Sequence, residues 1–296
     1  MTVIPGFASR RIATSGADIH VAIGGNGPPL LLLHGYPETH YCWHRVAPLL
    51  AGDFTLVCPD LRGYGASRAT VPETPDHAVH AKRAMAQDQV EMMAALGHDR
   101  FSVAGHDRGG RVAYRLALDH SERVAKLATL DIVPTLETFE RMNAASALSA
   151  YHWLFLAQRF DLPERLIGAD PDFYLEWTLG SWTGAGAFLA PDAMAAYKSA
   201  FRDPSVIHAA CEDYRAGATI DCDNDRADRE AGRRIACPLL ALWGGRRPAG
   251  TAAADPLATW RRWADTVEGA AIPCGHFLPE EAPDEVAGMM KAFFGR

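Results

Sequence analysis

The chain has 296 residues and a mass of 32.1 kDa, which is enough for one large domain or for one domain with a sizeable insertion. Its 48% of hydrophobic and 22% of charged residues are typical of a globular protein and exclude a collagenous, coiled-coil or disordered chain. The 29 Lys and Arg against 36 Asp and Glu give a net charge of −7, so general attraction to nucleic acid or to an anionic membrane is not expected. An anionic substrate would need a local basic site.

The cysteines and the N-terminus indicate a cellular location. The six cysteines form no C-x-x-C pair, and residues 1–5 lack a basic segment followed by an apolar one. The longest apolar run, around residues 30–33, is far shorter than the roughly 20 residues of a membrane span. We therefore expect reduced thiols and a soluble, cytoplasmic protein.

Short apolar runs bounded by turn residues predict strands that are buried on both faces. These runs are residues 30–33, 54–57, 101–104, 126–130 and 239–243. Residues 84–96 and 109–118 have helical patterns and separate some of the runs. The alternation predicts an α/β fold with a mostly parallel sheet flanked by helices. The Gly-rich residues 24–29 lead into a strand, so we interpret them as a hairpin turn and not as a phosphate loop.

The alternation stops between about Thr135 and Asp225, where aromatic-rich segments at residues 151–155 and 173–177 replace the strands. We predict a helical cap inserted after the strand that ends near Asp131. The expected core domain comprises residues 1–135 and 226–296, and the cap domain comprises residues 136–225.

The most specific motif is residues 103–110 (VAGHDRGG), a strand that ends in small-x-nucleophile-x-small and opens a helix. This is the nucleophile-elbow pattern with Asp107 at the nucleophile position. Gly105 and Gly109 fit because side chains there would collide with the strand and helix that the strained turn joins. An Asp that merely caps the helix is the alternative, but it leaves both glycines unexplained.

A carboxylate nucleophile needs a base and an oxyanion hole, because water must cleave the ester that displacement at saturated carbon leaves on Asp107. His276 follows the last apolar strand and is the predicted base. The loop after residues 239–243 has no acid until Asp255, so Asp131, at the carboxyl end of the preceding strand, is the predicted partner of His276. The predicted oxyanion donors are the backbone N–H groups of Tyr36 and Arg108.

Two arginines follow the nucleophile. Arg108 and Arg111 lie three residues apart on the first turn of the predicted helix, where positive charge opposes the helix dipole. An anion should compensate them, and the alternative is that both pair with Asp107 or a neighbouring acid. His40 and His44 have a four-residue spacing, but H-E-x-x-H is not matched and no metal site is expected.

The chain resembles the fluoroacetate dehalogenases (haloacetate dehalogenases) of the α/β-hydrolase superfamily over nearly its whole length. The core motifs are residues 34–40 (HGYPETH), 60–67 (DLRGYGAS) and 105–111 (GHDRGGR). The cap and tail motifs are residues 151–153 (YHW), 181–183 (SWT), 211–217 (CEDYRAG) and 275–281 (GHFLPEE), and the cap segments are the more specific. Departures are Arg68, where the family commonly has an acid, and Gly110 and Gly184, where other members can have larger residues.

The resemblance implies a role for each site residue. Asp107, His276 and Asp131 would be the nucleophile, the base and its partner, as the motifs already indicate. Arg108 and Arg111 would bind the substrate carboxylate. The expected halide site consists of His152, Trp153 and Tyr214, and Tyr151 and Trp182 are further pocket candidates. The resemblance also implies a homodimer.

The sequence therefore predicts a cofactor-independent hydrolase that converts a short 2-haloacid, a haloacetate and fluoroacetate among them, into the hydroxyacid and halide. An epoxide hydrolase is the enzyme alternative, because it uses the same Asp-His-Asp set together with cap tyrosines such as Tyr151 and Tyr214. A ligand-binding receptor with a hydrolase fold and no turnover is the non-enzyme alternative. The preferred halogen and chain length are not predicted.

Overall fold

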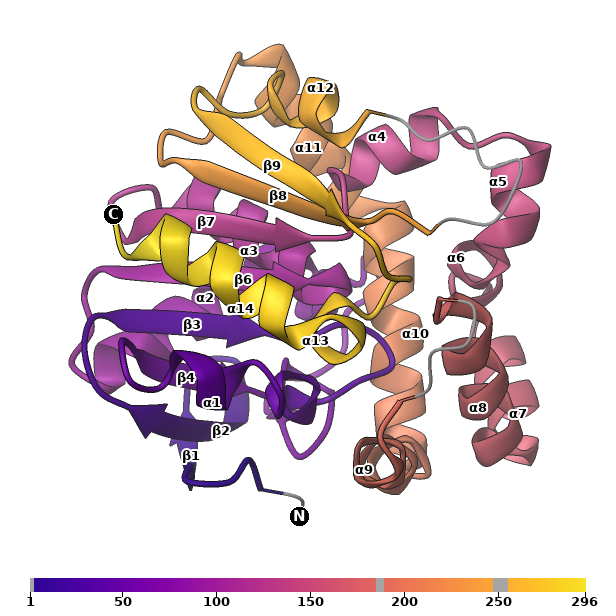
Figure 1. Ribbon diagram of the computed structural model, residues 1–296. Helices are drawn as coiled ribbons and strands as arrows, with labels where there is room; N and C mark the ends of the chain where they lie inside the picture. Colours follow the sequence, from indigo (N-terminus) through magenta and orange to yellow (C-terminus); the bar gives the residue numbers. More distant parts are fainter. Residues whose placement is uncertain (1–2, 185–188, 247–254) are drawn as a thin grey trace.

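The computed structural model describes residues 3–184, 189–246 and 255–296, and these form a central sheet with helices on both faces (Figure 1). The sheet order is β1-β2-β4-β3-β6-β7-β8-β9, with β5 paired to β2. The strands are β1 (Ala8–Ala13), β2 (Ala17–Gly25), β3 (Pro29–Leu33), β4 (Thr55–Pro59), β5 (Arg68–Ala69), β6 (Phe101–His106), β7 (Val124–Leu130), β8 (Leu239–Gly244) and β9 (Val267–Ile272).

The five predicted strands are present as β3, β4, β6, β7 and β8, and together with β9 they pair in parallel. Their apolar runs are buried on both faces, as for residues 30–33, because helices cover the two sides of the sheet. The hairpin interpretation of residues 24–29 is wrong. These residues connect β2 to β3, but β4 lies between the two strands and pairs with both.

Helices α2 (Lys82–Ala95) and α3 (Asp107–Asp119) pack together on one face of the sheet, and α14 (Pro283–Phe294) crosses the other face (Figure 1). The first two are the helices predicted at residues 84–96 and 109–118. Shorter helical elements of the core are α1 (Ala47–Leu50), α12 (Pro256–Trp260), α13 (Leu278–Glu281), η1 (His40–Trp43) and η2 (Ala78–His80). The carboxyl ends of β6, β7 and β8 meet at the sheet edge that faces α10.

A helical cap lies between β7 and β8, as predicted. Its helices are α4 (Thr135–Glu140), α5 (Ala144–Ser149), α6 (Tyr151–Leu156), α7 (Leu162–Ala169), α8 (Pro171–Trp182), α9 (Pro191–Phe201), α10 (Pro204–Ala218) and α11 (Ile220–Glu230). Helix α10 stands between the sheet edge and the outer helices α6, α7 and α8 (Figure 1), so most of its residues are buried. The predicted cap boundary at residue 225 falls inside α11.

The structure can be compared with the expectations about the cysteines and about membrane spans. All six cysteines are among the described residues and are free thiols, as expected. Within residues 3–184, 189–246 and 255–296, each helix is too short or too polar to span a lipid bilayer.

Candidate active site

The predicted nucleophile lies on a sharp turn between β6 and α3. Asp107 is the first residue of α3 and has a φ of +44°, a conformation that costs energy for a residue other than glycine. A Cβ on Gly105 would lie 2.3 Å from the carbonyl oxygen of Gly109, and one on Gly109 would lie 2.4 Å from that of His34. Both glycines are therefore required by close backbone contacts, as the motif predicts.

The Asp107 carboxylate is buried and held at both oxygens. Its Oδ1 accepts a hydrogen bond from the backbone N–H of Tyr36 at 3.1 Å, and its Oδ2 lies 3.8 Å from Nε2 of His276. Burial alone would raise the pKa of Asp107, but His276, His106 and the two arginines outweigh burial and hold this pKa well below its usual range. Asp107 is therefore an ionised carboxylate at neutral pH.

His276 is oriented by Asp131. Its Nδ1 donates to Oδ2 of Asp131 at 2.7 Å, which leaves Nε2 facing Asp107. Asp131 follows β7 with a φ of +55°, and its Oδ1 accepts from the backbone N–H of Gly244, the last residue of β8, at 3.0 Å. The structure thus brings together the three residues predicted as nucleophile, base and partner. Residues 247–254, in the loop that lacks an acid, lie outside the described residues.

A buried ion pair between Glu38 and His106, the last residue of β6, connects the segments around Glu38 and His276, and no sequence motif indicated it. Nδ1 of His106 lies 2.8 Å from Oε2 of Glu38, and Nε2 lies 2.8 Å from the carbonyl oxygen of His276. Both partners are acceptors, so both ring nitrogens must carry protons. Burial opposes this charge, but Glu38 outweighs it and raises the pKa of His106 to about 9. Glu38 also accepts from the N–H of Gly35 at 3.1 Å.

Of the two predicted oxyanion donors, Tyr36 contacts Asp107 and Arg108 follows it in the chain. The Tyr36 N–H already contacts the carboxylate. Arg108 is the second residue of α3, so its N–H has no acceptor within the helix. The role of these two N–H groups as the oxyanion hole stays a prediction.

The two predicted carboxylate-binding arginines differ in their surroundings. Arg108 pairs with a neighbouring acid, as the alternative interpretation held: its Nε and Nη2 donate to Asp213 at 2.9 and 2.6 Å. Arg111 instead donates from Nη1 to the Val133 carbonyl at 2.9 Å and to Thr135 at 3.2 Å. Within the described residues, one nitrogen of each guanidinium, Nη1 of Arg108 and Nε of Arg111, is buried without a hydrogen-bond partner. Buried unpaired cationic donors are costly, and an anionic ligand would satisfy them.

The predicted halide residues surround these arginines. The Tyr214 ring centroid lies 4.1 Å from the Arg108 guanidinium carbon, and the Trp153 centroid lies 4.4 Å from that of Arg111. His152 lies edge to face with Tyr214 at 5.7 Å. Burial lowers the pKa of His152 to about 3, so the ring is neutral. Its Nδ1 and the Tyr214 hydroxyl are buried and have no hydrogen-bond partner in the part of the chain that the structure describes.

Two other residues predicted to line the pocket are placed differently. The Trp182 ring lies 4.3 Å from that of His152 and 5.5 Å from that of His276, next to the predicted catalytic groups. Tyr151 contacts the His152 ring at 6.1 Å, but within the described parts of the chain it makes no ring contact with Tyr214.

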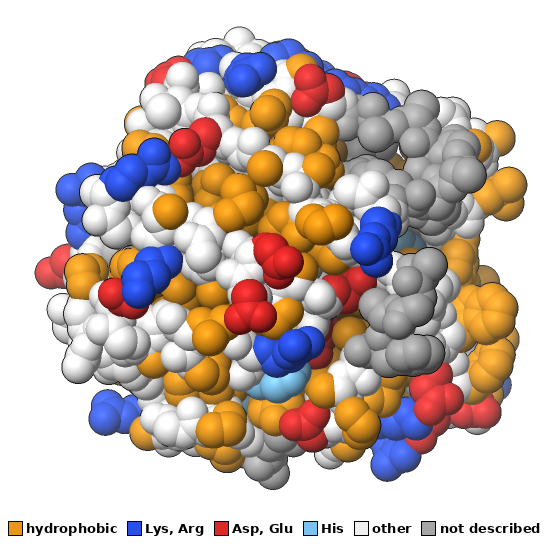
Figure 2. Space-filling view, viewed as in Figure 1, with side chains coloured by type: hydrophobic (Ala, Val, Ile, Leu, Met, Phe, Trp, Pro, Cys, Tyr) orange, Lys and Arg blue, Asp and Glu red, His pale blue; other side chains and the backbone are white. Residues whose placement is uncertain are grey.

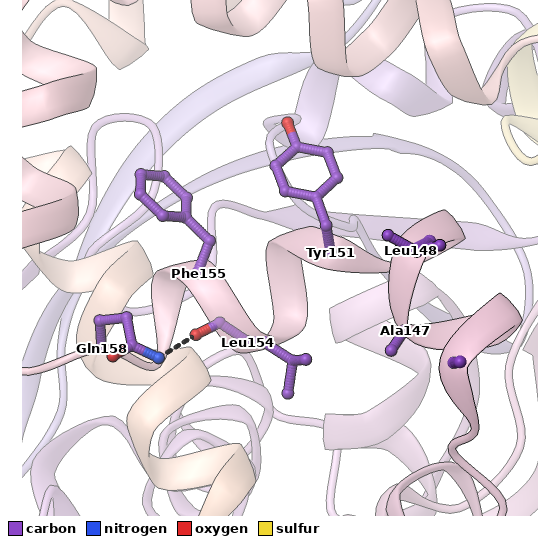
Figure 3. Close-up of a pocket in the computed structure, with 7 residues that line it drawn as sticks. Ala147, Leu148, Tyr151, Leu154, Phe155 and Gln158 are labelled. Carbon is purple, nitrogen blue, oxygen red and sulfur yellow. Dashed lines mark hydrogen bonds between the residues drawn. The ribbon is translucent and has the colours of Figure 1, made fainter.

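Tyr151 lines an apolar hollow of about 620 Å³ between α5 and α6 (Figure 3). The other lining residues are Ala144, Ala147, Leu148, Leu154, Phe155 and Gln158. Gln158 donates to the carbonyl oxygen of Leu154 at 2.7 Å and so remains on its own helical turn. None of the predicted catalytic residues lines this hollow.

His40 and His44 have different partners. Nδ1 of His40 lies 2.8 Å from Asp60, whereas Nδ1 of His44 lies 2.9 Å from the carbonyl oxygen of Tyr41. His20 also contacts Asp60, at 3.0 Å. Within the described ranges, His20, His40 and Asp60 are the group of side chains whose types and spacing could hold a metal ion. Because the two Nδ1 atoms are hydrogen-bonded to the carboxylate, we interpret this group as a buried hydrogen-bond cluster.

The described fold and site define a protein class. The family model for the alpha/beta hydrolase fold matches residues 28–283, and the chain belongs to this family. It is 44% identical over 292 residues to a fluoroacetate dehalogenase of Burkholderia sp, covering 97% of this chain and 94% of the relative. It is 35% identical over 285 residues to a soluble epoxide hydrolase of Corynebacterium sp. (strain C12), covering 95% and 94%. A crystal structure described as that of an alpha/beta hydrolase from Nostoc sp PCC 7120 has a TM-score of 0.94 at 50% identity, with 99% of each chain covered.

Proposed function

We propose that the protein is a haloacetate dehalogenase, a hydrolase that converts a short 2-haloacid into the hydroxyacid and halide. The observation that carries the proposal is the juxtaposition of an ionised Asp107 with two buried guanidinium nitrogens that lack a hydrogen-bond partner among the described residues. The similarity to the Burkholderia enzyme supports the same assignment. Fluoroacetate is included among the expected substrates.

In the proposed first step, Asp107 displaces the halide. Arg108 Nη1 and Arg111 Nε bind the substrate carboxylate and so orient the neighbouring carbon. One oxygen of Asp107 forms a bond to that carbon, and the carbon–halogen bond breaks with its electron pair leaving on the halide. His152, Trp153 and Tyr214 supply neutral donors to the departing ion.

In the proposed second step, water cleaves the ester. His276 removes a proton from water through Nε2, and Asp131 stabilises the imidazolium that forms. The resulting hydroxide attacks the Asp107 carbonyl carbon, and the Tyr36 and Arg108 N–H groups stabilise the oxyanion. The bond between Cγ of Asp107 and the ester oxygen then breaks. The hydroxyacid leaves with that oxygen as its hydroxyl and takes the proton back from His276, and Asp107 returns as a carboxylate that carries one oxygen from water.

Epoxide hydrolysis is the competing function, since the Corynebacterium relative carries that name. Such an enzyme opens a neutral ring, which would leave the buried Arg108 and Arg111 nitrogens without an anion. This observation favours the haloacid.

The test is halide release from chloroacetate and fluoroacetate by the wild type and by Asp107→Asn. In a single turnover in heavy-oxygen water, label should enter Asp107 before it appears in glycolate. His276→Asn should still form the ester and accumulate it, because alkylation needs the carboxylate and hydrolysis needs the base. Epoxide opening without halide release would establish the competing function. Ligand binding with no turnover of either substrate would indicate a receptor.

A homodimer and a cytoplasmic location belong to the same proposal. Several large apolar side chains of the cap are exposed: Leu148 (80%), Phe160 (71%), Phe173 (62%) and Trp177 (61%). Figure 2 shows hydrophobic side chains along the edge where α6 and α8 lie, and patches of this kind commonly mark protein contacts. Light scattering should give a dimer for the wild type and a monomer for Phe173→Glu/Trp177→Glu.

The proposal also includes the division into two domains. The core domain comprises residues 1–135 and 226–296, and the cap domain comprises residues 136–225.

A further inference from the structure

Asp213 is a fully buried acid of the cap whose charged and hydroxyl partners all belong to the core. It lies on α10, and its carboxylate accepts from Arg108, from the Tyr64 hydroxyl at 2.7 Å and from Nζ of Lys82. Lys82 is itself buried and begins α2, and its backbone N–H donates to Asp221 at 2.9 Å. One cap carboxylate thus joins three elements of the core.

These contacts determine how the Arg108 guanidinium faces the site. Nε and Nη2 are both directed at Asp213, and Nη2 donates in addition to the Asp213 carbonyl oxygen at 2.7 Å. The same helix encloses the group from two further sides. The Tyr214 ring lies over the guanidinium, and a Cβ on Gly217 would come within 3.1 Å of Nη2. Nη1 is the guanidinium nitrogen left without a hydrogen-bond partner among residues 3–184, 189–246 and 255–296.

Arg108 has a second acid within reach, the adjacent Asp107. A bidentate pair between them would satisfy the guanidinium, but it would occupy the oxygens that must attack carbon. Within the described residues no ion pair joins the two side chains, and the partner of Asp107 is His276. The position of Asp213 accounts for this separation, because it already holds two of the three guanidinium nitrogens.

We propose that Asp213 is a positioning residue that keeps Arg108 away from the nucleophile and directs Nη1 toward the substrate carboxylate. This inference rests on the proposed haloacid function. Because Asp213 belongs to the cap and its three partners belong to the core, seating of the cap on the core and assembly of the carboxylate site depend on the same contacts. Tyr64 and Lys82 act one step further out by holding Asp213.

The test is a double-mutant cycle of Asp213→Asn with Arg108→Leu, measured as kcat/KM for chloroacetate. Asp213→Asn should lower kcat/KM by about 100-fold, the size of a misplacement of about 1 Å at a reacting group. In the Arg108→Leu background the same change should cost less than about threefold, because there is no guanidinium left to position. If Asp213→Asn costs the same factor in both backgrounds, Asp213 acts independently of Arg108 and the proposal is wrong.

Two control variants distinguish a positioning role of Asp213 from a contribution to the stability of the fold. Asp88→Asn removes the partner of another buried bidentate pair, with Arg62, and should lower thermal stability while leaving kcat/KM unchanged. If Asp213→Asn does not fold, Tyr64→Phe takes its place, since it keeps every charge and deletes one hydrogen bond to Asp213. It should lower kcat/KM about fivefold in the wild type and have no effect beside Arg108→Leu. Equal effects in both backgrounds would contradict the proposal.

A readout without turnover distinguishes this inference from the proposed function. Acetate offers the same carboxylate and cannot react, so its affinity is measured by calorimetry. Asp213→Asn and Arg108→Leu should each weaken acetate binding, and the double variant should be no weaker than Arg108→Leu. Acetate binding with this pattern but without halide release would refute the haloacid function alone. Unchanged acetate affinity in Asp213→Asn would refute the positioning role.

Discussion

Replacement of His106 by Gln is expected to remove a buried positive charge and to change the pH dependence of stability. The wild-type ring lies between the Glu38 carboxylate and the His276 carbonyl oxygen, both at 2.8 Å, and is not exposed to solvent. A Gln amide could donate to one of these acceptors but carries no charge. The variant should therefore lose the coupling between folding and protonation at this position.

The magnitude follows from the difference between the folded and the ordinary pKa. His106 titrates at about 9 in the fold against 6.5 ordinarily, and at about 1.4 kcal/mol per pKa unit the difference corresponds to about 3 kcal/mol. Because the folded pKa is the higher one, this stabilisation is complete below pH 6.5. It is lost as the pH rises through about 9.

The assay is urea unfolding of the wild type and His106→Gln at about pH 6 and about pH 10. Groups that titrate alike in both proteins cancel in the difference between their pH slopes, which leaves the change caused by replacing His106. The wild type should lose about 3 kcal/mol more than the variant over this range. The His106 ring resonance in the folded wild type gives an independent check by NMR. A ring that titrates near 6.5, or equal pH slopes for the two proteins, would refute the reasoning.

Other predictions concern substrate, halide and backbone. Arg111→Leu should lower kcat/KM for chloroacetate by about 30-fold, equivalent to about 2 kcal/mol, and change that for neutral chloroacetamide little; equal losses would exclude a carboxylate role. Trp153→Phe and Tyr214→Phe should each slow release of fluoride more than of chloride, because compact fluoride gains more from a donor; a common factor for both halides would contradict this. Gly109→Ala should lower the melting temperature and the activity together, since its Cβ would lie 2.4 Å from the His34 carbonyl oxygen, and a stable, active variant would contradict the close contact.

The buried central strands and the candidate catalytic residues could be predicted from the sequence because each has a local pattern. A strand covered by helices on both faces must be apolar at successive positions, as in β3, and such a run stands out in the sequence. The elbow is equally local: Gly105 and Gly109 lie within two residues of Asp107 and meet backbone atoms directly. By contrast β1 is exposed along nearly its whole length, so it has no apolar run and was not predicted.

The pairing of the buried charged residues could not be predicted from the sequence, because it depends on the tertiary fold. Lys82, Asp213 and Glu38 have the side chains of solvent-facing residues, and each is buried against a partner far along the chain. Asp213 has no local pattern of this kind, because Glu212 and Arg215 lie beside it in the chain and give this turn of α10 the appearance of a solvent-facing one. The hairpin error has the same origin, since a turn sequence does not reveal that β4 enters between β2 and β3.

The proposed reaction involves two anions, the substrate carboxylate and the departing halide, and the groups that bind them differ in charge. The carboxylate is present from binding to release, so the permanent charges of Arg108 and Arg111 suit it. The halide acquires its charge only as the bond breaks, and it must then depart. Burial keeps His152 neutral, with a pKa of about 3, and the Tyr214 hydroxyl is neutral as well. Neutral donors stabilise the developing charge without adding a second strong ion pair that would retain the product, so a cation in place of His152 would bind free halide more tightly and slow its release.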